Sequence, residues 1–269
     1  MKIPATVGML TYNSADTLQR ALESVKEFDD IVICDGGSTD GTLNIARAFG
    51  ARVIPQHPEF KNPNGTLKDY AGVRNQLLEA AKYDWFLYID SDETASPGLV
   101  SDIHAATTSS VPLVYRVPIG IMMDGRYIKH SSNYPGYQHR FFNRLSAAHF
   151  VRPVHERIEF AAGTKVGTFA HPWYVHTTRD YWHHYLRETG GYRPLEITKA
   201  CVEPWGTYLL GALWQLRICL VIVAKSLWNY LRYGFRDTLP VRGELGRAAV
   251  PLVLVWKIFI CKLSRKSTS

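Results

Sequence analysis

Short apolar runs alternate with helical periodicities over the N-terminal third of the chain. Leu18, Leu22 and Val25 recur at the spacing of one helix face, after the polar Ser14 and Asp16, whose side-chain oxygens can cap a helix. The apolar runs are short enough to be buried strands. The pattern predicts strands at residues 3–10, 31–34, 52–54 and 85–89, and further helices at residues 43–49 and 69–81. This order predicts an α/β fold with a mostly parallel sheet flanked by helices.

The pattern changes after this alternation. Apolar residues at 113–118 and 137–142 predict two more strands, with a turn at Gly125 between them. Helical periodicity returns from Arg179. We therefore expect residues 1–200 to form one domain and residues 201–269 to form a separate helical segment.

The last quarter of the chain carries all of the excess charge. Residues 201–269 hold ten Lys and Arg against three Asp and Glu, which equals the net charge of +7 of the whole chain. The other positions are largely apolar and include tryptophans, which favour a membrane interface. On a helix, four of the basic residues fall within an arc of about 100°: Arg217, Lys225, Arg232 and Arg236.

Two interpretations of this segment are open. Arg217 and Lys225 interrupt the apolar residues 207–231, and the charge-free run between these two residues is 218–224. A spanning helix needs roughly 20 apolar residues, so this run is too short. The pattern, with a second apolar run at 248–260, predicts a basic amphipathic helix lying on an anionic membrane surface. The alternative is a helix packed on the domain with its charges in water.

The cysteines predict a reducing compartment. None of them forms a C-x-x-C pair, and one lies in a predicted buried strand, so we expect all to be unpaired apolar residues. The apolar stretch 3–10 is too short for a signal peptide, and we therefore expect a cytoplasmic protein. The cysteines are Cys34, Cys201, Cys219 and Cys261.

Polar residues follow three of the predicted strands at their carboxyl ends. Ligands of open parallel sheets bind outside this edge. The three polar clusters are Thr11-Tyr12-Asn13, the Gly-rich loop 35–41 and Asp90-Ser91-Asp92. We expect these clusters to meet in one cleft.

The residue types in the clusters favour a nucleotide and a metal. Asp90 and Asp92 can hold Mg²⁺ or Mn²⁺, which take oxygen ligands from few protein groups and from diphosphate. Asp35 can accept a hydrogen bond from a uracil N–H or a ribose hydroxyl, in a loop whose glycines let the backbone approach a ligand. Tyr12 offers a ring face for base stacking. The alternatives are a solvated turn at the acidic pair and a helix-capping turn at Asp35.

Four of these motifs occur in the order and spacing of a known enzyme family. Segments 7–13, 32–42, 74–75 and 84–93 resemble the family-2 glycosyltransferases of the GT-A fold. Segments 140–144 and 154–157, together with His176, are similar to the bacterial lipopolysaccharide-core β-1,4-glucosyltransferases. The resemblance covers about residues 3–195 and extends poorly into the tail.

The resemblance implies an inverting, metal-dependent sugar transfer. Asp35 would bind the nucleotide, Asp90 the ribose or the metal, and Asp92 the metal. His176 would be a third ligand of the Mg²⁺ or Mn²⁺, although a lone histidine is also compatible with a structural role.

Three arginines are candidate contacts of charged groups. Arg74 would face the donor diphosphate, or else pair with Asp69 or Glu79. Arg140 and Arg144 would bind the donor phosphate or an acidic acceptor.

Inversion in one displacement needs a carboxylate that takes the proton of the acceptor hydroxyl. Glu156 is the candidate for this base, and Glu93 is the alternative. If Glu156 is structural instead, we expect it to form an ion pair with Arg152 or Arg157.

Together these features predict an enzyme of cell-envelope biosynthesis. It would move glucose or another hexose from a nucleotide sugar such as UDP-glucose to a lipid-linked saccharide such as lipopolysaccharide core. It would bind peripherally to the inner face of the cell membrane and would not bind nucleic acid. The alternatives are a nucleotidyltransferase, although Thr11-Tyr12-Asn13 stands where such enzymes carry a phosphate loop, and a non-catalytic glycan-binding protein.

Overall fold

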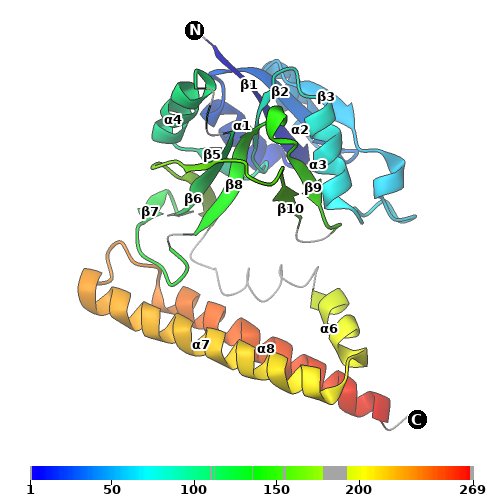
Figure 1. Cartoon of the computed structure of the whole chain (residues 1–269), viewed down its shortest axis with the longest axis vertical. Coiled ribbons are helices and arrows are strands. Elements are labelled where there is room, and N and C mark those ends of the chain that lie inside the picture. The colour runs from blue at the N-terminus through cyan, green and yellow to red at the C-terminus, as the bar shows by residue number, and fades with distance from the viewer. Residues whose placement is uncertain are drawn as a thin grey trace. The chain divides into compact units, whose positions relative to one another are not determined.

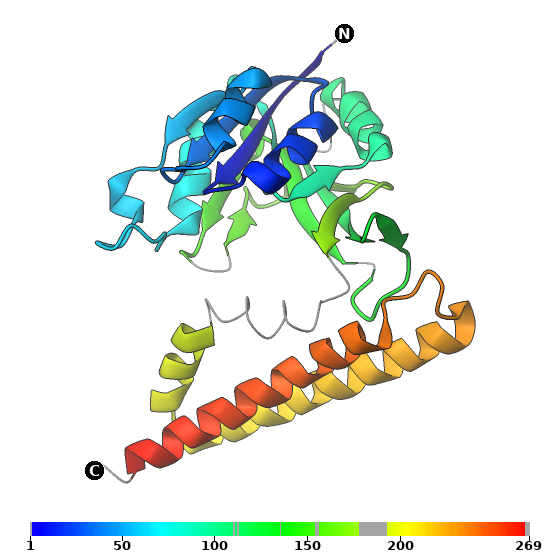
Figure 2. The same ribbon diagram turned by 180° about the vertical axis from the view of Figure 1, so that it is seen from behind.

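The computed structural model divides the chain into two compact units. One contains residues 1–120 and 135–176, and the other contains residues 121–134 and 177–269. Figures 1 and 2 show opposite sides of the chain. The structure describes residues 2–109, 111, 113–134, 136–153, 156–177 and 193–266. The predicted helix start at Arg179 therefore lies outside the described residues, and the division at residue 200 stays a prediction.

The first unit contains most of the strands. Its helices are α1 (Ala15–Ser24), α2 (Thr42–Ala48), α3 (Tyr70–Glu79) and α4 (Pro97–Thr107), with short 3₁₀ turns η1 (Pro58–Phe60) and η2 (Arg144–Ser146). Its strands are β1 (Ile3–Thr11), β2 (Phe28–Asp35), β3 (Arg52–Pro55), β4 (Trp85–Tyr88), β5 (Glu93–Ala95), β6 (Val114–Met123), β8 (Tyr137–Asn143), β9 (His149–Val151), β10 (Arg157–Glu159), β11 (Val166–Thr168) and β12 (Trp173–Thr177), of which β6 and β12 run on into the second unit.

The main sheet is parallel where the sequence predicts it. The strand order is β3-β2-β1-β4-β8-β6-β12-β5. β1 pairs in parallel with β2 and β4, and β2 pairs in parallel with β3. β8 is antiparallel to both β4 and β6. The predicted α/β fold, with a mostly parallel sheet flanked by helices, is confirmed.

Alternating side chains of the strands build a core on each face of the sheet. On β4, Leu87 packs with the helices α1, α2 and α4, whereas Phe86 packs with α3. The neighbouring β8 divides its side chains in the same way, with Phe141 on the first face and Phe142 on the second. Figures 1 and 2 show the corresponding helices on opposite sides of the sheet. Burial on both faces explains why these strands have continuous apolar sequences.

The second unit is mainly helical. It contains β7 (Arg126–Ile128), α6 (Arg193–Val202), α7 (Trp205–Tyr233) and α8 (Val241–Lys266). Gly125 has a φ of 76° and forms the turn between β6 and β7, as the sequence predicts. The helices α7 and α8 lie side by side as a hairpin (Figures 1 and 2). Near the bend of this hairpin, Leu239 is fully buried against Ile121, Met123 and Ile128.

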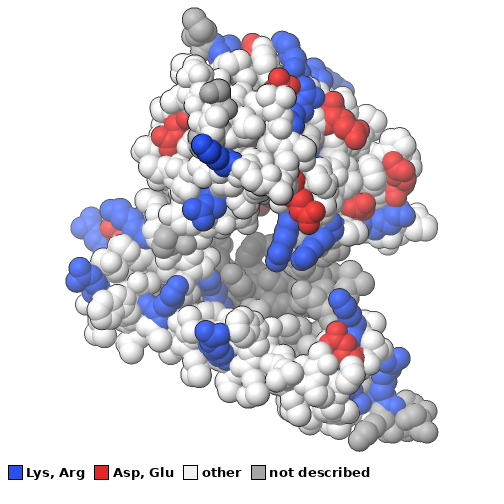
Figure 3. All heavy atoms as spheres, viewed as in Figure 1, with Lys and Arg blue, Asp and Glu red and all other residues white. Residues whose placement is uncertain are grey.

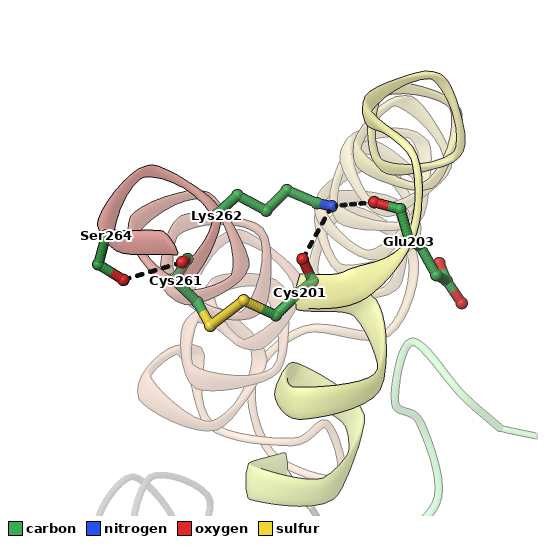
Figure 4. The surroundings of a disulfide bond; sticks show 5 residues. All are labelled: Cys201, Glu203, Cys261, Lys262 and Ser264. Atoms are coloured by element: carbon green, nitrogen blue, oxygen red, sulfur yellow. Dashed lines mark hydrogen bonds between the residues drawn. A yellow bond between two sulfur atoms is a disulfide. The ribbon is translucent and has the colours of Figure 1, made fainter. Parts of the chain in front are cut away.

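A disulfide between Cys201 and Cys261 joins α6 to α8 (Figure 4). The prediction that all four cysteines are unpaired is therefore wrong for these two. Their Cα atoms are 5.8 Å apart because α6 packs beside α8, and 60 residues separate them in the sequence. Beside the bond, the Lys262 ammonium donates to the carbonyls of Cys201 and Glu203. Cys34 is buried and unpaired, as predicted.

The helix α7 exposes an apolar surface along its length. Leu210 is 72% exposed, Leu220 is 62% exposed and Trp228 is 63% exposed. By length and composition this single helix of 29 residues could cross a membrane. The inference that no segment here is long enough to span is therefore wrong. Arg217 and Lys225 shorten the charge-free runs without ending the helix.

Candidate active site

Asp35 organises the loop that follows β2. Its carboxylate accepts hydrogen bonds from the backbone N–H groups of Gly37 and Ser38, both at 2.8 Å, and from the Ser38 hydroxyl at 2.6 Å. The Thr11 hydroxyl at the end of β1 donates another at 2.8 Å. Burial opposes ionisation, but the donors outweigh it and hold the pKa of Asp35 below its usual range. Asp35 is thus a charged anchor that shapes the loop.

A pocket of 570 Å³ lies beside this loop. Its wall includes Tyr12, which is 66% exposed, together with Gln56 and Lys61. The Lys61 ammonium donates to the Gly36 carbonyl at 2.7 Å. A Cβ on Gly36 would lie 3.0 Å from a ring carbon of Tyr12, so the glycine allows the ring to pack here. An exposed ring beside a Gly-rich backbone is suited to stacking a nucleotide base.

The acidic turn after β4 separates this pocket from a second one of 630 Å³. Ser91 lines the first pocket, and Asp90 lines the second. Burial raises the pKa of Asp92, and the negative charge of Asp90 raises it further. In the described part of the chain, no other residue donates a hydrogen bond to the Asp92 carboxylate. A carboxylate in this position fits a divalent cation, which would relieve its repulsion with Asp90.

Arg74, on α3, connects Asp90 to Glu156. Its Nη2 donates to Asp90 Oδ1 at 2.9 Å, and its Nε donates to Glu156 Oε1 at 2.6 Å. Burial opposes ionisation of Asp90, but the charges of Arg74 and Arg140 outweigh it and lower the pKa of Asp90. All three partners line the second pocket. The structure thus brings the predicted base to the acidic turn through one guanidinium.

These contacts replace the pairings that the sequence left open. Among the described side chains, Arg74 bonds neither Asp69 nor Glu79 on its own helix. Asp69 instead caps α3, accepting a hydrogen bond from the Gly72 N–H at 2.9 Å. The partner of Glu156 is Arg74 rather than an arginine adjacent in the sequence. The remaining nitrogen of Arg74, Nη1, is buried and has no hydrogen-bond partner among the described residues.

Glu93 and Arg140 form a second ion pair that is almost fully buried. Arg140 donates to both Glu93 oxygens, at 2.6 and 3.1 Å. Glu93 also accepts from the Trp173 indole at 3.1 Å and from the Asp90 N–H at 3.0 Å. With four donors directed at it, Glu93 has no free oxygen for an acceptor hydroxyl. Because its guanidinium is bonded to Glu93, Arg140 is not free to bind a donor phosphate.

His176 lies on β12 and is bonded to Thr94. Its Nε2 is 2.8 Å from the Thr94 hydroxyl, and burial lowers the pKa of the ring. Across the described ranges, no three His, Cys, Asp or Glu side chains are grouped so that they could hold a metal ion. The structure therefore does not join His176 to Asp90 and Asp92 as a third ligand, and the candidate metal ligands are the two aspartates.

The sequence profile of the family described as "Glycosyl transferase family 2" matches residues 6–169. This span contains the Asp35 loop, the acidic turn, Arg74 and Glu156. The chain belongs to glycosyltransferase family 2. The family match supports sugar transfer over the nucleotidyltransferase and glycan-binding alternatives.

Relatives of this glycosyltransferase match over part of their length. The SPbeta prophage-derived glycosyltransferase SunS of Bacillus subtilis is 32% identical over 92 residues, which is 34% of this chain and 20% of SunS. An uncharacterized glycosyltransferase of Rickettsia prowazekii is 31% identical over 121 residues, which is 44% of this chain and 38% of that protein. The chain thus spans less than half of these relatives.

Solved structures also resemble the glycosyltransferase, at low scores. S. aureus TarS 1–349 in complex with UDP has a TM-score of 0.46 at 14% identity, covering 100% of this chain and 92% of that chain. Glucosyl-3-phosphoglycerate synthase from Mycobacterium tuberculosis, in complex with Mn²⁺, UDP and glucosyl-3-phosphoglycerate, has a TM-score of 0.34 at 23% identity. It covers 45% of this chain and 44% of that one. Similarity at this level gives no information about ligands.

Arg144 lies at the wrong edge of the sheet to be a site residue. It follows β8, which runs antiparallel to β4, and Asn143 pairs with Trp85 at the start of β4. Arg144 therefore lies at the amino end of β4, where it bonds Asp84 at 3.0 Å, whereas Asp90 follows the carboxyl end. The expectation that Arg144 contacts donor or acceptor is wrong for this geometric reason.

The sequence analysis missed several residues of the two pockets. Tyr88 ends β4, and the guanidinium carbons of Arg74 and Arg140 lie 4.8 and 4.4 Å from its ring centre. An aromatic residue at the carboxyl end of a strand, two positions before Asp90, was a signal that could have identified it. Lys61 lies in an irregular segment and has no such signal.

We expect the two ion pairs of this glycosyltransferase to differ in their contribution to stability. Glu93→Gln should lower the free energy of unfolding by about 3–5 kcal/mol, because it leaves the buried Arg140 without a counter-charge. The matched change Asp84→Asn breaks the exposed pair with Arg144 and should cost less than about 1 kcal/mol. Urea unfolding of both variants measures the difference. Equal losses would show that Arg140 is not held by Glu93 in solution.

Proposed function

We propose that this glycosyltransferase transfers a hexose, with inversion, from a uridine diphosphate donor to a lipid-linked saccharide at a membrane surface. The uridine base, the hexose and the lipopolysaccharide-core type of acceptor come from the resemblance of the motifs described above. The single observation that carries the proposal is that Asp90 and Glu156 line one pocket and share the Arg74 guanidinium, while Ser91 of the same acidic turn lines the other pocket. One pocket suits a nucleotide, and the other suits an acceptor.

Residues of the first pocket would hold the donor. Tyr12 stacks on the base, and the loop that Asp35 shapes presents backbone groups to the nucleoside. Asp90 and Asp92 would hold Mg²⁺ or Mn²⁺, which when bound neutralises the charge of the diphosphate. Arg74 adds a buried positive charge beside Asp90. The donor phosphates would therefore lie beside the acidic turn.

Glu156 would act as the base in the second pocket. Its Oε1 is held by Arg74, and no described residue donates to Oε2. The acceptor hydroxyl oxygen attacks the anomeric carbon as the bond to the diphosphate oxygen breaks, and the hydroxyl proton passes to Glu156. The nucleoside diphosphate leaves with the electron pair of the broken bond. Attack on the face opposite the leaving group inverts the anomeric centre.

The hairpin of α7 and α8 would bind the membrane in the plane of its surface. A spanning α7 would place Arg217 near the bilayer centre, which costs roughly 2.5–3.5 kcal/mol or more. Lying in the interface, the helix can bury Leu210, Leu220 and Trp228 while its basic residues stay near lipid phosphates. We therefore propose a peripheral location on the inner face of the cell membrane, with residues 1–200 as the catalytic domain.

The metal proposal predicts the behaviour of Asp92→Asn, which removes a charge and keeps the shape. The midpoint of thermal unfolding should rise with UDP-glucose and Mn²⁺ for the unchanged protein, since a ligand that binds only the native state stabilises it. For Asp92→Asn the Mn²⁺-dependent part of this rise should disappear, and transfer should fall by orders of magnitude. Asp84→Asn is the matched control. Near-normal turnover and an unchanged Mn²⁺ response in Asp92→Asn would show that the metal assignment is wrong.

The base proposal predicts a different kinetic signature. Glu156→Gln keeps an oxygen for Arg74 but cannot take the proton, so kcat should fall by about 10²- to 10⁴-fold while donor binding stays unchanged. Glu159→Gln, on the strand β10 that directly follows Glu156, is exposed and should have no effect. Steady-state kinetics with a soluble saccharide acceptor measures both. Weaker donor binding with normal kcat would instead mean that Glu156 positions Arg74.

The membrane proposal predicts sedimentation with vesicles that contain phosphatidylglycerol. High salt should release only part of the protein, because it screens charge but not apolar insertion. Leu220→Glu combined with Trp228→Glu should reduce sedimentation, whereas Leu145→Glu, at an equally exposed position of the first unit, should not. If the unchanged protein stays in the supernatant at low salt, the peripheral location is wrong.

A further inference from the structure

An apolar groove opens at the bend of the α7–α8 hairpin, within the second unit. Its volume is 410 Å³, which lies in the range of about 300–1,000 Å³ that small-ligand pockets occupy. Side chains from both helices line it, together with Phe235 from the connection between them. The groove is built from elements that the glycosyl transfer proposed above does not use.

The polar groups in the groove are already bonded within the protein. Glu244 is buried and accepts from the N–H and the hydroxyl of Ser132, at 2.7 and 2.6 Å. The Tyr230 hydroxyl donates to the Leu239 carbonyl at 2.7 Å, and Ser226 donates to a carbonyl one turn earlier at 2.7 Å. None of these groups needs a polar ligand. The groove therefore suits a hydrocarbon chain.

The rim of the groove exposes large apolar side chains. Leu231 is 76% exposed, Phe235 is 71% exposed and Leu227 is 58% exposed. These residues continue the apolar surface of α7 that includes Trp228 and Leu220. A contiguous apolar surface of this kind marks an interaction site in a soluble protein. Because the groove is continuous with the surface that we propose to be embedded in lipid, a lipid chain can enter it directly.

Three arginines flank the groove, and each directly follows a lining residue in the sequence: Arg232, Arg236 and Arg242. All three are exposed, and within the described ranges none of them forms an ion pair. Figure 3 shows Lys and Arg side chains gathered around the bend between the two helices.

The nearby acids do not neutralise these arginines. Asp237 bonds Arg126 at 2.8 Å and Lys129 at 3.2 Å. The other acid near the bend is Glu244, which is buried against Ser132. The rim therefore keeps a charge that is complementary to a phosphate. A second copy of this chain would bring the same positive charges to the groove and would be repelled.

We propose that the groove binds one hydrocarbon chain of an anionic membrane phospholipid, and that Arg232, Arg236 and Arg242 hold its phosphate. The site would bind the hairpin to one specific lipid molecule rather than to the diffuse negative charge of a membrane surface. It rests on the proposed membrane-facing role of the hairpin but not on the sugar-transfer chemistry.

Native mass spectrometry of the full-length protein in a neutral detergent tests the site. We expect one phosphatidylglycerol to be retained per chain, and phosphatidylcholine to be retained far less. Replacing Arg232, Arg236 and Arg242 together by Gln should weaken phosphatidylglycerol binding by about 100-fold, since each basic residue contributes roughly 1 kcal/mol near an anionic lipid. The matched control replaces Arg217, Lys225 and Lys257 by Gln, which removes the same charge elsewhere on the hairpin and should leave the complex intact.

A second pair of variants tests the groove itself. Leu231→Trp adds bulk at the rim and should displace the lipid chain. Leu220→Trp makes the same change on α7 outside the groove and should not. Both positions are exposed, so the fold should tolerate either ring. The thermal response to UDP-glucose and Mn²⁺ should be unchanged in all these variants, which separates this site from the donor site.

Three results would overturn the proposal. Equal retention of phosphatidylcholine, in which the choline ammonium balances the phosphate, would mean that the arginines do not select an anionic headgroup. Equal loss in the two triple variants would mean diffuse electrostatic binding. Dimers that Leu231→Trp abolishes would mean that a second copy fills the groove. If the one-to-one lipid complex forms but the protein does not sediment with vesicles, the membrane location proposed above fails while the lipid site stands.

Discussion

Parallel pairing of β1 with β2 and with β4 determines where the polar side chains meet. The register sets Thr11 opposite Asp35 and Gly8 opposite Tyr88. Because these strands point in the same direction, the residues that follow them emerge at one edge of the sheet. A shift of the strand pairing by one residue would turn the buried side chains of the shifted strand towards the opposite face of the sheet. The two apolar cores therefore hold in place the edge on which both pockets are built.

The two arginines of this edge are buried to the same extent but have different surroundings. Arg140 is directed at a single carboxylate, Glu93, and stacks between Tyr88 and Trp173. Arg74 divides its donors between Asp90 and Glu156, which lie far apart in the sequence of the first unit. The first arrangement is a closed structural pair. The second couples the acidic turn to the proposed base, so a charge that binds at Asp90 is felt at Glu156.

The sequence predicted the parts of the fold that depend on local periodicity. The strands β1 to β4 and the helix α3 lie within a few residues of their predicted bounds, because each combines a clear apolar run with a polar end. Strands β9 to β11 have only three residues each, which is too short for a period to be visible. The helix α7 was predicted as a basic amphipathic helix, but its charge-free runs were judged too short to span, because a count that stops at each charge does not recognise a long apolar helix that contains charged residues.

The candidate site was predicted by residue type, but its contacts were not. Asp35, Asp90 and Asp92 lie at the predicted edge because they end or follow the parallel strands β2 and β4, whereas Glu156 precedes β10 and is joined to Asp90 through Arg74. Glu156, one of the two partners of Arg74, is 82 residues away from it in the sequence, and the disulfide joins two cysteines that are 60 residues apart. Such pairings depend on how elements pack in three dimensions, and a single sequence contains no local signal for them. Arg144 is a further case, since the antiparallel direction of β8, which places it beside Asp84, has no local signal in the sequence.

The Nη1 of Arg74 is buried and finds no acceptor in the part of the chain that the structure describes, which has a thermodynamic consequence. A buried donor without an acceptor raises the free energy of the folded state by about 1–3 kcal/mol. Any ligand that supplies an oxygen to this nitrogen recovers that free energy in addition to its own contacts. Occupancy of the second pocket, which Arg74 lines, is thereby linked to the stability of the folded unit.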